Sequence, residues 1–162
     1  MDTPQALLPH LDAAVNLASY LVGNEHDAQD IVQESVLRAM RSPATCRGGN
    51  VRAWLLAIVR NACFDSMRRK KVVPFEPIAE DAQIVDQKKS ADPAKILQQA
   101  ENVAVIRSAI AKLSPELRES IVLREMEGLP YRDIADVTGV PIGTVMSRLA
   151  RARKQLAEMI GG

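Results

Sequence analysis

The C-terminal segment PIGTVMSRLARARKQL carries hydroxyl and guanidinium side chains at helical spacing. One face of the expected helix is apolar and consists of Ile142, Val145, Leu149, Ala152 and Leu156. Another face carries the polar residues Thr144, Ser147, Arg148 and Arg151. Guanidinium groups bind guanine edges or phosphates, and hydroxyls bind either, so this face has the chemistry of a DNA major-groove reader. A solvated cationic face is the alternative, but the preceding short helix YRDIADVT and the turn residue Gly139 complete a helix-turn-helix pattern and favour DNA.

A second chemically distinctive segment, NACFDSMRRKK, ends in a run of cations. Helical spacing places four of its polar residues on one face and its shoulder: Asn61, Asp65, Arg68 and Arg69. A basic helix end can simply complement the helix dipole. The four consecutive cations at residues 68–71 exceed what that role requires. We therefore expect this helix end to contact nucleic-acid phosphates.

The segment HDAQDIVQESVLRA carries a second stripe besides its apolar face, made of Asp30, Gln33, Glu34 and Leu37. A leucine is misplaced on a purely solvated face, which favours a protein-docking surface. Metal binding by Asp27, Asp30 and Glu34 is an alternative, but no glycine-containing coordinating loop accompanies them. Charge supports docking, because residues 12–34 hold five acidic residues and no Lys or Arg, whereas residues 38–71 are strongly basic. An acidic block suggests a protein partner and a basic block suggests nucleic acid.

The possible soft metal ligands of the chain are few. Cys46, Cys63, His10 and His26 show neither CxxC nor HxxxH spacing, so a zinc site would need four isolated residues to converge. We interpret the cysteines as buried or incidental thiols in a reducing compartment. No catalytic residue, metal or other cofactor is expected.

Composition limits the fold that must position these residues. The 162 residues, 47% of them hydrophobic, can bury one modest core or two small ones, and an aromatic content of 3% favours helices over sheets. No apolar run approaches the roughly 18 residues of a membrane span, and the N-terminus lacks the regions of a secretory signal. We expect a cytoplasmic protein.

The pattern along the chain predicts an all-α protein of two small helical domains joined by a flexible linker. In the first domain, residues 1–71, one helix begins near Leu7 and ends at Gly23-Asn24, a second covers about 26–41, and a third runs from Val51 into RRKK. Residues 72–91 contain prolines and scattered charge without a sustained period, which indicates the linker. The second domain, residues 92–162, has helix starts at Asp92-Pro93 and Ser114-Pro115.

Three segments in register resemble the two conserved domains of extracytoplasmic-function (ECF) sigma factors of the sigma-70 family. They are DAQDIVQE, RAWLLAIVRNACFDSMRR, and LSPELRESIVLREMEGLPYRDIADVTGVPIGTVMSRLARARKQL. The resemblance covers nearly the whole chain and implies a sigma region 2-like bundle followed by a sigma region 4-like helix-turn-helix domain. It implies promoter recognition and transcription initiation in a stress or envelope response, with the RNA polymerase core, promoter DNA and an anti-sigma factor as partners, and without catalysis by the chain itself.

The resemblance also implies a role for each stripe. Asp30, Gln33, Glu34 and Leu37 would dock on the clamp helices of the largest polymerase subunit. The loop near residues 42–50 would hold an extruded base of the minus-ten element, and the matching residues of the next helix are Trp54, Asn61, Asp65, Arg68 and Arg69. Thr144, Met146, Ser147, Arg148 and Arg151 would face the minus-thirty-five element. Met146 departs from the family, whose members often have Lys or Arg there, and Asp133 replaces the commoner Glu.

Two other classes of protein stay open at this point. A stand-alone helix-turn-helix regulator would bind an operator without polymerase, but it leaves the acidic stripe and the first domain unexplained. A metal-dependent nuclease could use the acidic cluster, but nothing supplies the residues that would orient its ligands.

Overall fold

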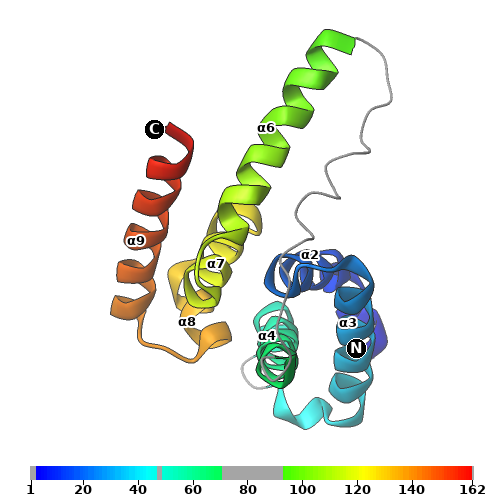
Figure 1. Ribbon diagram of the computed structural model, residues 1–162. Coiled ribbons are helices and arrows are strands. Elements are labelled where there is room, and N and C mark those ends of the chain that lie inside the picture. Colours follow the sequence, from blue (N-terminus) through cyan, green and yellow to red (C-terminus); the bar gives the residue numbers. More distant parts are fainter. Residues whose placement is uncertain (1–2, 47–48, 71–92, 162) are drawn as a thin grey trace.

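The computed structural model describes residues 3–46, 49–70 and 93–161. Every regular element in these ranges is a helix or helical turn, and the helices form one group before and one after the expected linker (Figure 1). The linker predicted at residues 72–91 lies outside the described residues. The predicted all-α fold with two small helical domains is confirmed. No helix in the described part is long and apolar enough to cross a membrane.

The first domain is a bundle in which α2, α3 and α4 pack against one another. Its elements are α1 (Thr3–Leu7), the short 3-10 turn η1 (Leu8–His10), α2 (Leu11–Val22), α3 (Glu25–Arg41), η2 (Pro43–Thr45) and α4 (Val51–Lys70). Gly23 ends α2 in the left-handed conformation with φ 74°, and the Asn24 side chain begins α3 by accepting from the Asp27 amide at 3.0 Å. The predicted first helix is interrupted at η1, where Pro9 supplies no backbone donor.

The second domain consists of α6 (Pro93–Ala111), α7 (Pro115–Ile121), a π-helical segment labelled η4 (Val122–Met126), α8 (Tyr131–Thr138) and α9 (Ile142–Gly161). Ser114 caps α7 by accepting from the Leu117 amide at 3.4 Å. Gly139 turns the chain between α8 and α9 with φ 74°, as the helix-turn-helix pattern predicted. The inner face of α9 contains Val145, Leu149 and Ala152, all fully buried.

The two domains lie against each other. Helix α4 packs on α8, and α2 packs on α7 and touches α6. Buried residues of both domains belong to one continuous apolar cluster, which includes Leu56 and Val59 of α4 and Ile121 and Val137 of the second domain. The side chains of α4 therefore face two neighbours, its own bundle and the helix-turn-helix domain.

Leu55 and Leu37 offer a matched test of this core. Leu55 is completely buried, whereas Leu37 is 45% exposed. Leu55→Ala should lower the free energy of unfolding by about 2–5 kcal/mol, because it leaves a cavity in the bundle. Leu37→Ala should change it by less than about 0.5 kcal/mol. Urea denaturation followed by circular dichroism measures both, and equal losses would contradict the packing described here.

Candidate nucleic-acid and protein interfaces

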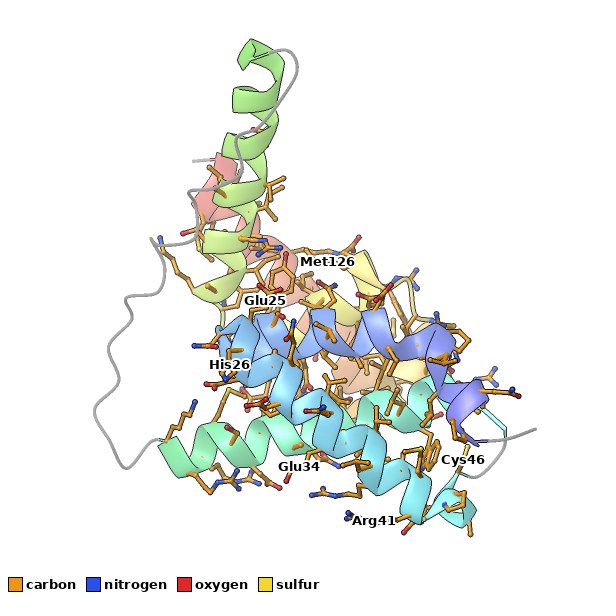
Figure 2. All side chains as sticks on the ribbon, turned by 90° about the vertical axis from the view of Figure 1, so that its right-hand side faces the viewer. Glu25, His26, Glu34, Arg41, Cys46 and Met126 are labelled. Atoms are coloured by element: carbon orange, nitrogen blue, oxygen red, sulfur yellow. The ribbon has the colours of Figure 1, made fainter. Side chains whose placement is uncertain are left out.

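The acidic stripe predicted on α3 lies on the outer side of the first domain. Asp30, Gln33, Glu34 and Leu37 are all exposed, while the opposite face buries Ala28, Val32, Ser35 and Ala39. Glu34 lies on the outside of the bundle (Figure 2). The structure thus brings the four predicted residues onto one continuous and accessible surface.

Asp27, near the start of α3, forms a salt bridge of its own. Its carboxylate accepts from Lys70 Nζ at 2.7 Å, which ties the start of α3 to the end of α4. The part of the chain that the structure describes holds no group of three or more His, Cys, Asp or Glu residues that could bind a metal. The contacts of Asp27 are those of a salt bridge between helices.

The residues predicted to face the minus-ten element occupy two separate stretches of α4. Trp54, near the start of the helix, is half-buried, and its Nε1 donates to Thr45 Oγ1 at 2.9 Å. This bond anchors η2, part of the predicted base-holding loop. Asn61, Asp65, Arg68 and Arg69 are exposed further along the helix. Trp54 and Arg69 lie about 22 Å apart along the helix axis, at about 1.5 Å per residue.

Pairing reduces the free charge at the end of α4. Arg68 forms a salt bridge with Asp65, one turn earlier on the same exposed surface, and Lys70 is held by Asp27. Exposed pairs of this kind are weak, so a phosphate can replace the carboxylate. Arg69 is exposed as well.

The face of α9 that was predicted to contact the minus-thirty-five element contains both exposed and covered residues. Met146, Ser147 and Arg151 are exposed, and Thr144 is half-buried. Ser147 Oγ donates to the Thr144 carbonyl at 3.2 Å. Arg148 differs from its neighbours, because its side chain is only 18% exposed and points toward α7. The structure therefore does not bring Arg148 onto the same accessible surface as Arg151.

Arg148 belongs to a charged group centred on Glu119, whose side chain is completely buried. Arg60 of α4 donates to both Glu119 carboxylate oxygens, from Nε at 2.7 Å and from Nη2 at 3.1 Å. Arg148 Nη1 lies 3.7 Å from the second oxygen. We call Arg60, Glu119 and Arg148 the Glu119 cluster. It joins α4 of the first domain to α7 and α9 of the second.

Burial dominates the electrostatics of this cluster. Removal from water raises the pKa of Glu119 above its usual range, and the hydrogen bond and charge of Arg60 and the charge of Arg148 oppose that rise. Arg60 also lies over the Phe64 ring, with its guanidinium carbon 4.0 Å from the ring centroid. Sequence reasoning missed Glu119 and Arg60. A signal existed for Glu119, because its neighbours three and four residues on, Val122 and Leu123, are apolar.

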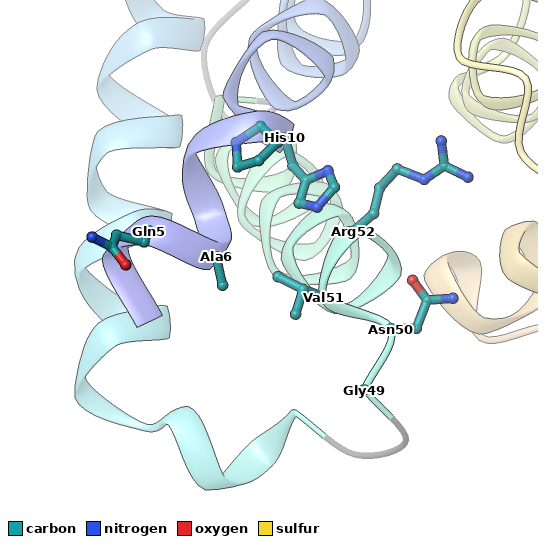
Figure 3. A pocket seen from close by; sticks show the side chains of 8 residues that line it. Gln5, Ala6, His10, Gly49, Asn50, Val51 and Arg52 are labelled. Carbon is teal, nitrogen blue, oxygen red and sulfur yellow. The ribbon is translucent and has the colours of Figure 1, made fainter. Parts of the chain in front are cut away.

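The thiols and the two histidines lie beside these interfaces. His26 Nε2 is 3.7 Å from Asp30 Oδ2 of the stripe on α3. Burial, with a further contribution from the charge of Glu119, raises the pKa of the Cys63 thiol to about 12. Cys46 is half-buried and free. His10 lines an open hollow beside Asn50 and Arg52 (Figure 3), where burial and then the charge of Arg52 lower its pKa.

Arg148 and Arg151 should respond differently to the same substitution. Arg148→Ala removes one of the two cations beside a buried carboxylate and should lower the free energy of unfolding by about 1–3 kcal/mol. Arg151→Ala alters only an exposed side chain and should change it by less than about 0.5 kcal/mol. Urea denaturation of the two variants measures the difference. Identical stabilities would show that the Glu119 cluster does not depend on Arg148.

Family comparisons agree with both halves of this architecture. The model of Sigma-70 region 2 matches residues 7–72, and the model of Sigma-70, region 4, matches residues 104–156. Among solved structures, the sigma factor RpoE from Bartonella quintana, in complex with the anti-sigma factor NepR, superposes with a TM-score of 0.76 at 30% identity over 99% of this chain and 97% of that chain. CnrH in complex with the cytosolic domain of CnrY shares the fold, with a TM-score of 0.70 at 24% identity over 98% of this chain and 87% of that chain.

Curated relatives of the chain belong to the same family. The ECF RNA polymerase sigma factor SigE of Mycolicibacterium smegmatis is 36% identical over 93% of this chain, which spans 58% of the length of SigE. SigM of Mycobacterium tuberculosis is 34% identical over 90% of this chain and 70% of its own length. EcfG of Rhodopseudomonas palustris is 34% identical over 96% of this chain and 81% of its own length. With both sigma-70 regions present in order, the chain belongs to the extracytoplasmic-function sigma factors of the sigma-70 family.

Proposed function

We propose that this chain is a promoter-specificity subunit of bacterial RNA polymerase, with residues 1–71 and 92–162 as its two working domains and 72–91 as the linker. The observation that carries the proposal is the presence of two different exposed surfaces on two domains: an acidic stripe on α3 and a hydroxyl and guanidinium face on α9. A regulator that acts alone needs only the second surface. Members of this family regulate transcription rather than catalyse reactions, and the proposed steps require no nucleotide or metal from the chain.

The α3 stripe is the proposed docking surface for the clamp helices of the largest polymerase subunit. Asp30 and Glu34 present exposed carboxylates that suit a cationic partner surface, and Gln33 lies between them. Leu37, 45% exposed, continues the stripe as an apolar anchor. The stripe lies opposite the buried face of α3, so docking requires no change in the bundle.

Helix α4 and the preceding loop are the proposed site for the melted minus-ten element. Trp54 offers a partly exposed ring and holds η2 through Thr45. Asn61, Arg68 and Arg69 supply donors further along the helix, where Asp65 pairs with Arg68 in the free chain. Stacking on an aromatic side chain combined with cationic contacts is how proteins retain single-stranded DNA.

Helix α9 is the proposed reader of the minus-thirty-five element. Arg151 and Ser147 are exposed donors, and Met146, 52% exposed, presents an apolar group beside them. An arginine can distinguish guanine, and an apolar side chain can contact a thymine methyl group. Thr144 and Arg148 are less accessible in this arrangement.

An anti-sigma factor is the proposed regulator. RpoE of Bartonella quintana, similar to this chain over nearly its full length, is in complex with the anti-sigma factor NepR. Sequestration by such a partner would block the surfaces that the polymerase needs, and both would act in the cytoplasm where transcription takes place.

Charge reversal on the α3 stripe tests the proposed function. Asp30→Lys with Glu34→Lys should weaken binding to core RNA polymerase by about tenfold or more and abolish promoter-dependent transcription, because the carboxylates face the partner rather than the core of the bundle. Fluorescence anisotropy of the labelled chain measures binding, and run-off transcription measures initiation. Helical circular dichroism should stay unchanged.

The matched control reverses two exposed acidic residues of the same domain, Asp12→Lys with Glu25→Lys, and should bind core normally. Equal affinity of the stripe variant and the wild type for core would remove the docking assignment. Strong specific binding of a duplex operator by the isolated wild-type chain, together with no affinity for core, would favour a stand-alone regulator.

A further inference from the structure

One ion pair within the first domain joins the proposed docking helix to the proposed strand-binding helix. Lys70 Nζ, in the last turn of α4, donates to Asp27 Oδ2, in the first turn of α3, at 2.7 Å. The Asp27 side chain is 35% exposed and that of Lys70 is 58% exposed. An ion pair as accessible as this is weak, so a charged group from outside can take the place of either partner.

Asp27 continues the line of the α3 stripe by one helical turn toward the N-terminus. Spacings of three, four and three residues place four side chains on one side of the helix: Asp27, Asp30, Glu34 and Leu37. Asn24 caps α3 by accepting from the Asp27 amide at 3.0 Å, so the cap does not use the Asp27 carboxylate. A cationic partner that covers the stripe can therefore bind this carboxylate without disturbing the start of α3.

Lys70 lies where it can contact the same DNA strand as its neighbours. It directly follows Arg68 and Arg69, the exposed cations proposed to hold the melted minus-ten element, and its flexible stem lets the ammonium group turn away from α3. Asp65 pairs with Arg68 and Asp27 pairs with Lys70, so carboxylates offset two of the three positive charges at residues 68–70. A carboxylate 2.7 Å from the ammonium group repels a phosphate that approaches the same group.

We propose that Lys70 is a further DNA-contacting residue of the first domain and that Asp27 withholds it until α3 is docked. A polymerase cation at Asp27 releases Lys70, which then binds a phosphate of the melted strand. By linkage, a phosphate at Lys70 equally frees Asp27 for the polymerase. The two binding events strengthen each other through this exchange of partners. This inference rests on the proposed function, because the exchange connects its docking surface to its strand-binding surface.

Asp27→Asn tests the competition in the free full-length chain. The probe is a fluorescently labelled single-stranded oligothymidylate, because a phosphate contact needs no particular sequence. The variant should bind this strand about two- to fivefold more tightly, which is the range of one exposed ion pair. The slope of log affinity against log salt should also become steeper by roughly 0.7, the contribution of one added phosphate contact to a single strand. A purely structural role of Asp27 would not change this slope.

Matched variants separate the contact from the overall charge and from the fold. Asp12→Asn, at an exposed position of α2, changes the net charge equally and should leave the salt slope unaltered. Asp27→Glu keeps the carboxylate and should bind the strand as the wild type does.

A Lys70→Gln background shows whether the gain passes through Lys70. In that background Asp27→Asn should raise the affinity no more than Asp12→Asn does, because the ammonium group that it would release is missing. A gain that persists without Lys70 would overturn the proposal. So would an Asp27→Asn chain that binds oligothymidylate no better than Asp12→Asn.

Docking should increase the contribution of Lys70 to strand binding. In the holoenzyme, Lys70→Gln should weaken binding of a single-stranded minus-ten element, selected with the holoenzyme from a random library, by about two- to fivefold. In the free wild-type chain the same substitution should weaken strand binding by less than about twofold, because Asp27 already occupies the ammonium group.

Arg69→Gln is the control for docking, since Arg69 is exposed beside Lys70 but is not held by Asp27. It should weaken strand binding alike in the free chain and in the holoenzyme. Equal losses for Lys70→Gln in the free chain and in the holoenzyme, or no loss in the holoenzyme, would overturn the exchange.

The two arms separate this inference from the proposed function. Failure of the holoenzyme to select any promoter would count against the proposed function. The oligothymidylate comparison needs no promoter, so it would still decide whether Asp27 withholds Lys70.

Discussion

The arrangement of the two domains depends on one carboxylate that is buried where they meet. The Glu119 side chain is completely buried, and burial of an ionised carboxylate costs several kcal/mol unless cations and hydrogen bonds compensate. Arg60 and Arg148 provide that compensation from helices far apart in the sequence. Helices α4, α7 and α9 must therefore meet at one point, and the mutual position of the two domains follows from it.

The same constraint separates the two proposed activities of the chain. The α3 stripe lies on the outside of the first domain and needs no rearrangement to meet a protein partner. The reading helix α9 is partly engaged, because Arg148 faces Glu119 while Arg151 and Ser147 face solvent.

Local rules predicted most of the fold from the sequence. Gly23-Asn24, Ser114-Pro115 and Gly139 mark helix boundaries because each signal acts on the backbone beside it, and the structure confirms all three. Apolar spacing likewise identified Val145, Leu149 and Ala152 as the buried face of α9, but Ile142, predicted on the same face, is 44% exposed. The interruption at η1 was missed, since a single proline near the start of a helix is compatible with its continuation.

Local sequence patterns could not predict the ion pairs between residues that lie far apart in the sequence. Arg148 was predicted to share an accessible face with Arg151, but it lies next to inward-facing Leu149 and pairs across the domain with Glu119. Its partner is 29 positions earlier in the chain, and the contact from Arg60 to Glu119 spans 59. Periodicity places a side chain on a face but does not identify the surface opposite it. The exposure of the stripe on α3 was easier to predict, because none of the described helices covers that face.

A double-mutant cycle between Arg60 and Glu119 tests the central interaction most directly. The free energy of unfolding of the wild type, Arg60→Gln, Glu119→Gln and the double variant gives the coupling energy of the two side chains. The account predicts a favourable coupling of at least about 1 kcal/mol, because Arg60→Gln leaves a buried carboxylate short of its principal partner only when Glu119 is present. Additive effects within about 0.5 kcal/mol would show that the two residues act independently, and would contradict the account.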